Sequence, residues 1–312
     1  MTKIRDAKIQ ILMSTYNGEQ YIKQQINSII NQTFQNWELL IRDDNSIDDT
    51  KNIISYYAEN DSRIKIIPSF KNVGVKRSFI TLLQTSTAPF FMFSDQDDVW
   101  KKDKVQDSIN LIKDSSKVPT LGYTGLTVVD QNLNFIDENI INKNISKVNS
   151  FERLVFTNQV TGATIIGNSL LREAVFSKIN LDVSLISMHD WWISLVASEF
   201  GDIRYCNKST MLYRQHDNNV LGATVSRLKK LKKLKNIVIY IKSAKAEIKK
   251  TFIQAEYFYN MFGKKISIND LKILEAVLKI RKNGNFIIKL KILFKHSVNG
   301  ILQNFFLLIK LF

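Results

Sequence analysis

The chain has 312 residues, enough for one domain of about 220 residues and a smaller appendage. Its formal net charge is +15, and its single cysteine, Cys206, excludes an intrachain disulfide and fits a reducing cytosol. No His and Cys cluster with zinc-ligand spacing is present, which argues against a structural zinc site. The charges of Lys3, Arg5, Asp6 and Lys8 interrupt any apolar run, so we expect no signal peptide.

Apolar runs alternate with amphipathic segments through the first third of the chain. The predicted strands are residues 9–14, 37–42, 64–67 and 89–94, and the predicted helices are residues 21–30, 53–57 and 101–112. Strand, turn and helix in repetition, with polar residues where strands end, predict a parallel α/β sheet. In such sheets ligands bind beyond the carboxyl ends of the strands.

Polar groups follow three of these strands, at residues 15–17, at residues 43–44 and at Asp95-Gln96-Asp97-Asp98. The last group is the densest cluster of carboxylates in the chain. Each pair of like charges in contact costs on the order of 1 to 4 kcal/mol. A divalent cation would offset this repulsion, and a solvated turn with helix-capping acids is the other interpretation. We expect Asp98 to cap the following helix.

Several of these motifs occur in one order and resemble a known family. From about residue 9 to residue 222, the chain resembles the family 2 inverting glycosyltransferases with a GT-A fold. The motifs are Ser14-Thr15-Tyr16-Asn17-Gly18, Gln32-Thr33, residues 38–46 and Asp95-Gln96-Asp97-Asp98. Residues 213–219 further resemble the bacterial rhamnosyltransferase-like members. The resemblance implies an α/β GT-A fold, a Rossmann-like nucleotide-binding mixed sheet flanked by helices.

The resemblance also implies how the donor nucleotide binds. Residues on the first loop line the base and ribose, namely Thr15, Tyr16 and Asn17. Asp44 accepts a hydrogen bond from the pyrimidine imide, and the alternative is an Asx-turn or helix-capping role. Lys76 or Arg77 contacts the nucleotide, and an exposed salt bridge is the alternative for either.

Asp95 and Asp97 correspond to the D-x-D motif of the family. The resemblance implies that Asp95 contacts ribose or metal-bound water and that Asp97 binds the Mn²⁺ or Mg²⁺ that bridges the diphosphate. Arg214 and His216 follow a predicted strand at residues 209–213, on a loop that covers the diphosphate. His216 is expected to complete the metal shell, with an exposed structural role as the alternative.

Asp190 is the expected general base, because the family places an acid-rich motif at this position. The family commonly has Glu before this Asp, whereas His189 stands here and removes one negative charge. The alternative role for Asp190 is to cap an apolar helix over residues 193–200. Gly162 resembles the position that lines the donor sugar and acceptor, and an ordinary turn glycine is the other interpretation.

Residues 225–312 form a basic region, with 20 Lys and Arg against 4 Asp and Glu, whereas residues 1–224 are close to neutral. We expect residues 1–224 to be the catalytic domain and residues 225–312 a basic amphipathic helical appendage. An apolar helical stripe is predicted, followed by a second helix; its members are Val238, Ile241, Ile248, Phe252 and Tyr259, then Leu271, Leu274, Val277 and Leu278. The end of the chain lacks the uninterrupted apolar run of a membrane-spanning helix.

This pattern predicts peripheral binding to an anionic membrane. The alternative is a helical subdomain packed on the catalytic domain or on a second copy in a homo-oligomer. No nucleic-acid partner is expected, because no recognised binding motif is present.

The expected reaction is metal-dependent, inverting transfer of a hexose or deoxyhexose from a nucleoside diphosphate sugar, such as dTDP-rhamnose or a UDP-hexose. The expected acceptor is a lipid-linked saccharide at the cytosolic face of the membrane, in surface polysaccharide synthesis. Two alternatives remain open from the residues: a non-catalytic protein that binds sugar nucleotides, and a scaffold of a polysaccharide assembly complex.

Overall fold

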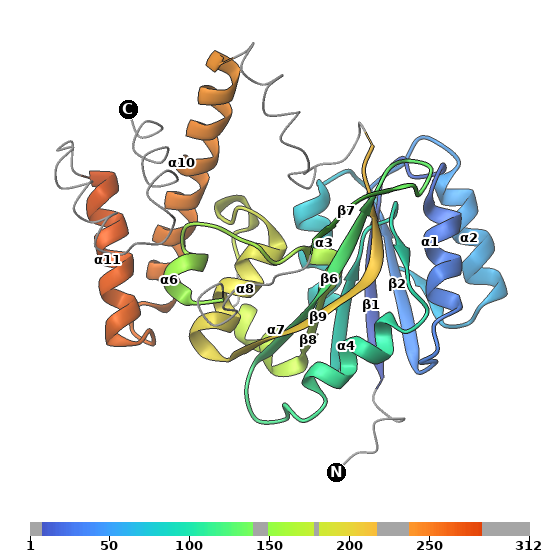
Figure 1. Ribbon diagram of the computed structural model, residues 1–312, viewed down its shortest axis with the longest axis horizontal. Coiled ribbons are helices and arrows are strands. Elements are labelled where there is room, and N and C mark those ends of the chain that lie inside the picture. Colours follow the sequence, from blue (N-terminus) through green and yellow to red (C-terminus); the bar gives the residue numbers. More distant parts are fainter. Residues whose placement is uncertain (1–7, 140–148, 178–180, 217–236, 283–312) are drawn as a thin grey trace.

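The computed structural model describes residues 8–139, 149–177, 181–216 and 237–282 (Figure 1). Nine strands in these residues form one mixed sheet, in the order β3-β2-β1-β4-β8-β6-β9-β5, with β7 paired to β6. The strands are β1 (Ile9–Thr15), β2 (Trp37–Asp43), β3 (Ile64–Ile66), β4 (Phe90–Ser94), β5 (Val99–Trp100), β6 (Thr120–Val129), β7 (Phe135–Asn139), β8 (Ile165–Asn168) and β9 (Asp202–Arg214). The predicted mixed sheet is confirmed.

The first half of the sheet is parallel, as the sequence predicted. β1 pairs with β2 on one side and with β4 on the other, and β2 pairs with β3. In register, Thr15 lies opposite Asp43 and Met13 lies opposite Ser94. The carboxyl ends of β1, β2 and β4 therefore meet at one edge of the sheet, and the polar groups that follow them are neighbours.

The second half of the sheet contains antiparallel pairs that the sequence did not indicate. β8 runs antiparallel to both β4 and β6, whereas β6 and β9 are parallel. β9 is a 13-residue strand, longer than the five-residue strand predicted at residues 209–213. Arg214 is therefore the last residue of a strand and does not lie on a loop.

Helices cover both faces of the sheet, and the sheet divides the apolar core into two clusters. Ile11 and Met13 of β1 face one cluster, and Leu12 faces the other, as alternation along a strand requires. The first cluster includes α1, α2 and α4, and the second includes α3, α7, α8 and parts of α10 and α11. The helices are α1 (Ile22–Ile30), α2 (Thr50–Asn60), α3 (Val75–Thr85), α4 (Lys104–Ile112), α6 (Phe151–Leu154), α7 (Ser169–Val175), α8 (His189–Phe200), α10 (Ile237–Phe262) and α11 (Ile268–Lys282), with the short 3-10 turns η2 (Gly162–Thr164) and η3 (Val183–Leu185).

The start of α4 corrects one prediction. The helix begins at Lys104, because the preceding residues Val99 and Trp100 pair as β5 with β9. Asp98 lies before β5, so it does not cap this helix. Its carboxylate instead accepts the backbone N–H of Arg214 at 3.1 Å, which ties the acidic loop to the end of β9.

Helices α10 and α11, the described part of the C-terminal region, pack against the helices beside the sheet. Trp192 of α8 is fully buried, and its ring lies 5.5 Å from that of Phe258 and 6.1 Å from that of Phe262, both on α10. Leu274 and Val277 of α11 join the same core. Figure 1 shows α10 and α11 beside α6 and α8, at the opposite end of the molecule from α1 and α2. In the described residues, the apolar stripe therefore packs on the rest of the protein, which was the alternative to membrane binding. Phe252 is among its buried members.

The rest of the basic region lies outside the described residues. This includes the lysine-rich run at residues 227–235, the segment at 283–312 and the predicted boundary between residues 224 and 225. Among the helices that the structure describes, none is long and apolar enough to span a bilayer.

Candidate active site

The loops after β1 and β2 are fastened to each other through Asp43. Thr15 Oγ1 donates a hydrogen bond to Asp43 Oδ1 at 2.9 Å, and the backbone N–H of Ser46 donates to Asp43 Oδ2 at 2.8 Å. Ser46 Oγ in turn accepts the backbone N–H of Asn17 at 2.9 Å. Asn17 has a φ of 47°, a left-handed conformation that asparagine tolerates well. Thr15, at the end of β1, and Asn17, on the loop that follows, are thus held at the edge of the sheet.

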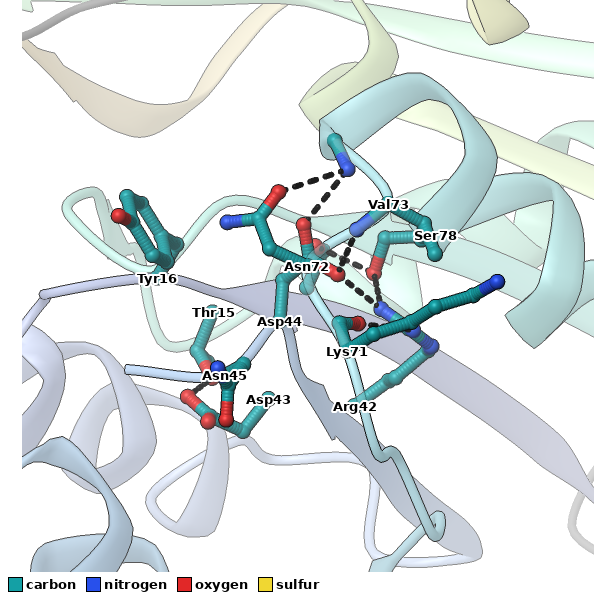
Figure 2. Close-up of polar contacts among 12 residues, drawn as sticks. Thr15, Tyr16, Arg42, Asp43, Asp44, Asn45, Lys71, Asn72, Val73 and Ser78 are labelled. Atoms are coloured by element: carbon teal, nitrogen blue, oxygen red, sulfur yellow. Dashed lines mark hydrogen bonds and ion pairs between the residues drawn. The ribbon is translucent and has the colours of Figure 1, made fainter. Parts of the chain in front are cut away.

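Asp44 forms the centre of a polar cradle (Figure 2). Its Oδ1 accepts hydrogen bonds from Arg42 Nη1 at 2.6 Å and from the backbone N–H of Val73 at 2.8 Å. Its Oδ2 accepts the N–H of Gly74 at 2.7 Å, which leaves this oxygen capacity for another donor. Arg42 Nη1 also donates to Ser78 Oγ at 3.1 Å. The carboxylate therefore links β2 to the segment before α3, and its contact with a pyrimidine stays a prediction.

Gln96 joins the acidic loop to the loop after β1. Its Oε1 accepts the backbone N–H of Tyr16 at 2.8 Å, and its Nε2 donates to the Tyr16 carbonyl at 2.9 Å. A Cβ on Gly18 would lie 2.2 Å from Gln96 Oε1, so the glycine makes room for this contact. Tyr16 itself is 48% exposed, at the rim of the cradle in Figure 2. The sequence alone assigned Gln96 no role, because its partner Tyr16 lies 80 residues away along the chain.

Asp97 and His216 come together as predicted for a shared site. His216 Nε2 lies 2.8 Å from Asp97 Oδ2, and its ring lies 5.0 Å from the ring of Tyr21. Asp97 is also held through its carbonyl, which accepts a hydrogen bond from Arg214 Nε at 2.7 Å. The end of β9 and the residue two positions after it thus hold Asp97, which lies 117 and 119 residues away from them along the chain, through both its carbonyl and its carboxylate.

Arg214 differs from its predicted role. Its side chain is only 1% exposed, and besides Asp97 it donates to the Gln131 carbonyl and to Gln24 Oε1, both at 2.6 Å. The guanidinium carbon lies 4.5 Å from the Tyr21 ring centroid. Arg214 is a buried residue that holds the acidic loop in place. It does not lie on a loop that closes over the diphosphate.

The acidic loop concentrates negative charge. Burial, and then the charges of Asp97 and Asp190, raises the pKa of Asp95 to about 7. Burial and the charges of Asp97 and Asp95 likewise raise the pKa of Asp98 well above its ordinary value. Asp98 Oδ2 is a buried oxygen without a hydrogen-bond partner among the described residues. A bound cation would offset the repulsion between these carboxylates and would favour their ionised forms.

The predicted metal ligands suit an open site more than a closed cage. The described residues contain no group of three or more His, Cys, Asp or Glu side chains arranged to hold a metal ion. Mg²⁺ and Mn²⁺ are usually bound by one or two carboxylates together with substrate phosphates. Asp97 and Asp95 offer hard oxygens and His216 offers an imidazole. These donor types suit a cation that a substrate diphosphate would help to hold, because the three side chains do not form a metal cage by themselves.

Asp190 lies in the first turn of α8 with both carboxylate oxygens engaged. Oδ2 accepts the backbone N–H of Gly162 at 3.1 Å, and Oδ1 accepts the N–H of Trp191 at 2.6 Å. Burial raises the pKa of Asp190 to about 6, against the lowering effect of these two hydrogen bonds. Helix α8 begins at His189, with Met188 at its N-cap position, so Asp190 is inside the helix and does not cap it.

The ring of His189 packs against two aromatic side chains, and it leaves no room for a side chain at position 162. Its ring stacks 4.3 Å from Phe79 and lies edge-on, 5.0 Å from Phe93. Burial lowers the pKa of His189 to about 3, so the ring is neutral. Neither ring nitrogen has a hydrogen-bond partner among the described residues. A Cβ on Gly162 would lie 2.9 Å from His189 Nε2, so this glycine is required by close packing and is not an ordinary turn residue.

Lys76 and Arg77 face the segment before α8. Lys76 Nζ donates to the Ile186 carbonyl at 2.6 Å. The positive charges of Arg77 and Lys76 act on Asp182 and help to lower its pKa, after its hydrogen bonds with Ser184. These contacts join the first turn of α3 to the segment at residues 182–186.

Comparison with known proteins identifies the family. The model of glycosyl transferase family 2 matches residues 10–179. The chain belongs to this family. It is 31% identical over 240 residues to the dTDP-rhamnosyl transferase RfbG of Shigella flexneri, covering 71% of this chain and 78% of that protein. It is 35% identical over 107 residues to the Escherichia coli glucosyltransferase WfgD, covering 34% of this chain and 42% of that one.

Solved structures support the fold of this family 2 glycosyltransferase. Staphylococcus aureus TarS 1–349 in complex with UDP has a TM-score of 0.56 and 19% identity, over 96% of this chain and 90% of the TarS 1–349 chain. The mannosyltransferase PcManGT of Pyrobaculum calidifontis, in complex with GDP-Man and Mn²⁺, has a TM-score of 0.52 and 13% identity, over 97% and 83%. The GT-A fold and the glycosyltransferase class predicted from the sequence are confirmed.

Proposed function

We propose that this enzyme transfers a sugar from a nucleoside diphosphate sugar to a saccharide hydroxyl, with inversion at the anomeric carbon and with Asp190 as general base. The observation that carries the proposal is the meeting of two carboxylate groups from distant parts of the chain. Asp190 Oδ2 accepts the N–H of Gly162, the first residue of η2, and η2 packs against β4, the strand that leads into Asp95. The charge of Asp190 accordingly contributes to the raised pKa of Asp95. A base and a site for the leaving diphosphate are therefore close enough to act on one substrate.

The donor nucleotide binds at the cradle formed by the loops after β1 and β2. Thr15, Tyr16 and Asn17 line the base and ribose, and the free capacity of Asp44 Oδ2 accepts the imide N–H of a pyrimidine. A uracil or thymine base satisfies this contact equally, so the donor is a UDP-hexose or dTDP-rhamnose. The name of RfbG favours dTDP-rhamnose, and the TarS structure with UDP-GlcNAc favours UDP.

Asp190 takes the proton of the acceptor hydroxyl. As that oxygen forms its bond to the anomeric carbon, the bond between this carbon and the diphosphate breaks, and the diphosphate leaves with both electrons. The two N–H groups that hold Asp190 orient its carboxylate, while its pKa of about 6 keeps it ionised at neutral pH. A general base placed in this way contributes roughly 10²–10⁴-fold to the rate. Neutral His189 next to it adds no competing charge.

Asp97, Asp95 and His216 are proposed to hold a divalent cation, Mn²⁺ or Mg²⁺, together with the donor diphosphate. When bound, such an ion neutralises the charge that develops on the leaving group. Arg214 and Gln96 keep these ligands in position, through the Asp97 carbonyl and the Tyr16 backbone respectively.

The proposed acceptor is a lipid-linked saccharide, and the reaction takes place at the cytosolic face of the membrane in surface polysaccharide synthesis. The name of WfgD, which specifies a diphosphoundecaprenol-linked acceptor, supports this choice. The basic residues of 225–312 supply charge for peripheral contact with anionic lipid.

A donor panel tests the proposal. Thermal shift measurements with dTDP-rhamnose, UDP-glucose, UDP-galactose and UDP-N-acetylhexosamines, each with Mn²⁺, Mg²⁺ or EDTA, should show stabilisation by one donor when metal is present. The Asp190→Asn variant should be stabilised to the same extent. No response to any donor would contradict the proposal and favour a scaffold protein.

A further inference from the structure

An open pocket of about 320 Å³ lies between the first turn of α3 and the η3 turn. Its lining residues are Val73, Gly74, Val75, Lys76 and Arg77 on one side, with Val183 and Ser184 on the other. The donor cradle uses the same stretch of chain, because Asp44 accepts the N–H groups of Val73 and Gly74. The pocket and the donor site are therefore neighbours that share these two residues.

Positive charge gathers around this pocket. Lys76 Nζ is held at the wall by the Ile186 carbonyl, at 2.6 Å. Burial and the nearby charges of Lys250 and Arg77 lower the pKa of Lys76. The carboxylate of Asp182 is also near and offsets one of these three charges, so the group keeps a net positive charge. An excess of positive charge at the pocket favours the binding of an anion.

The start of α3 adds to this charge. The helix has 11 residues and begins at Val75, after Gly74 at a φ of 81°, with no side chain capping its first N–H groups. The first N–H groups of an α-helix lack intrahelical partners and carry partial positive charge. Together with Lys76 and Arg77, this helix end presents donors suited to phosphate oxygens.

Helix α10 fixes the opposite wall of the pocket. The N–H of Asp182 donates to the Tyr257 hydroxyl at 2.6 Å, and the N–H of Ser187 donates to Gln254 Oε1 at 2.8 Å. Lys250, Gln254 and Tyr257 are spaced at i, i+4 and i+7, so they share one face of this helix. Lys250 thus comes from the same face that holds the segment at residues 182–187, one turn further toward the start of α10.

The pocket is also close to the general base. Phe79, which stacks on His189, lies four residues after Val75, or about 6 Å along the axis of α3. Helix α3 also packs against η3, on the other wall, and against α8, the helix that carries Asp190. The pocket and Asp190 thus lie on elements that are in direct contact.

We propose that this pocket binds the diphosphate through which the acceptor saccharide is attached to its lipid, with Arg77, Lys250 and the start of α3 as its recognition elements. The inference rests on the proposed function, because it concerns the acceptor of that reaction. It assigns Arg77 to the acceptor instead of the nucleotide, and it gives the C-terminal helices a role in forming the acceptor site.

Calorimetric titration with farnesyl diphosphate, a short lipid diphosphate, tests this inference. The full chain is first saturated with UDP or dTDP, whichever it binds, with Mg²⁺ in excess over both diphosphates. We expect farnesyl diphosphate to bind without displacing the nucleotide and farnesol to show no binding. Arg77→Gln and Lys250→Gln should each weaken the probe about tenfold. Lys249→Gln, an exposed neighbour outside the shared face of α10, is the matched control and should have no effect.

The outcomes separate this inference from the proposed function. A protein that binds nucleotide but not the probe contradicts the acceptor pocket alone, as does a probe that competes with the nucleotide or ignores both substitutions. Loss of nucleotide binding in Arg77→Gln would return this residue to the donor site and overturn the assignment. A wild-type protein that binds neither UDP nor dTDP contradicts the proposed function itself.

Discussion

Replacing Gly162 by alanine is expected to displace Asp190, the proposed general base, through the histidine next to it. The new Cβ would lie 2.9 Å from His189 Nε2 and 3.5 Å from Asp190 Cβ. His189 cannot move aside freely, because Phe79 and Phe93 hold its ring at 4.3 Å and 5.0 Å. Overpacking of this kind costs about 1–3 kcal/mol in the free energy of unfolding. A shift of Asp190 on the order of 1 Å would lower kcat by about 100-fold.

Steady-state kinetics and urea unfolding of Gly162→Ala measure both effects. The double variant Gly162→Ala/His189→Ala removes the obstructing ring and serves as the control. If steric conflict is the cause, alanine at position 162 should cost far less kcat in the His189→Ala background than in the wild type. A Gly162→Ala enzyme with unchanged kcat and stability would refute the packing argument, and equal losses in both backgrounds would refute the role of His189.

Three further predictions concern the proposed base Asp190, the divalent cation and the buried Arg214. Asp190 acts only when ionised, so with a pKa of about 6 the pH profile of kcat/KM should be flat above about pH 7 and fall tenfold per pH unit below about pH 6; a profile without this acidic limb would exclude Asp190 as the base. Removal of divalent ions with EDTA should abolish transfer, and Mn²⁺ or Mg²⁺ should restore it; turnover in EDTA would exclude the ligand role of Asp97 and His216. Arg214→Met should lower the free energy of unfolding by about 2–4 kcal/mol in urea titrations, because the buried guanidinium makes three charge-assisted hydrogen bonds that the variant lacks. An unchanged unfolding midpoint would show that these hydrogen bonds do not stabilise the fold.

The parallel half of the sheet could be predicted because its signals are local. β1, β2 and β4 are short apolar runs that end in polar residues, and a parallel sheet brings these ends to one edge. The antiparallel half lacks such signals. β8 has four residues, and the last pairs of β9 with β6 depend on contacts between residues about 85 positions apart.

The sequence indicated which residues belong to the candidate site, but it did not indicate the contacts that hold them there. Asp190 and Asp95 belong to motifs that are readable in the sequence, whereas the partners of Arg214 are scattered along the chain, with Gln24 as far as 190 residues away. The sequence indicated that His189 replaces an acid. The aromatic box that buries the ring, formed by Phe79 and Phe93 from other elements, follows only from the packing of α3 and β4 against α8.

The configuration of the product tests the central claim most directly. Proton NMR of the saccharide formed from the stabilising donor reports the anomeric configuration of the new bond. The account predicts a configuration opposite to that of the donor, with no product formed by Asp190→Asn at donor saturation. Retention of the donor configuration, or product formation by Asp190→Asn at the wild-type rate, would contradict it.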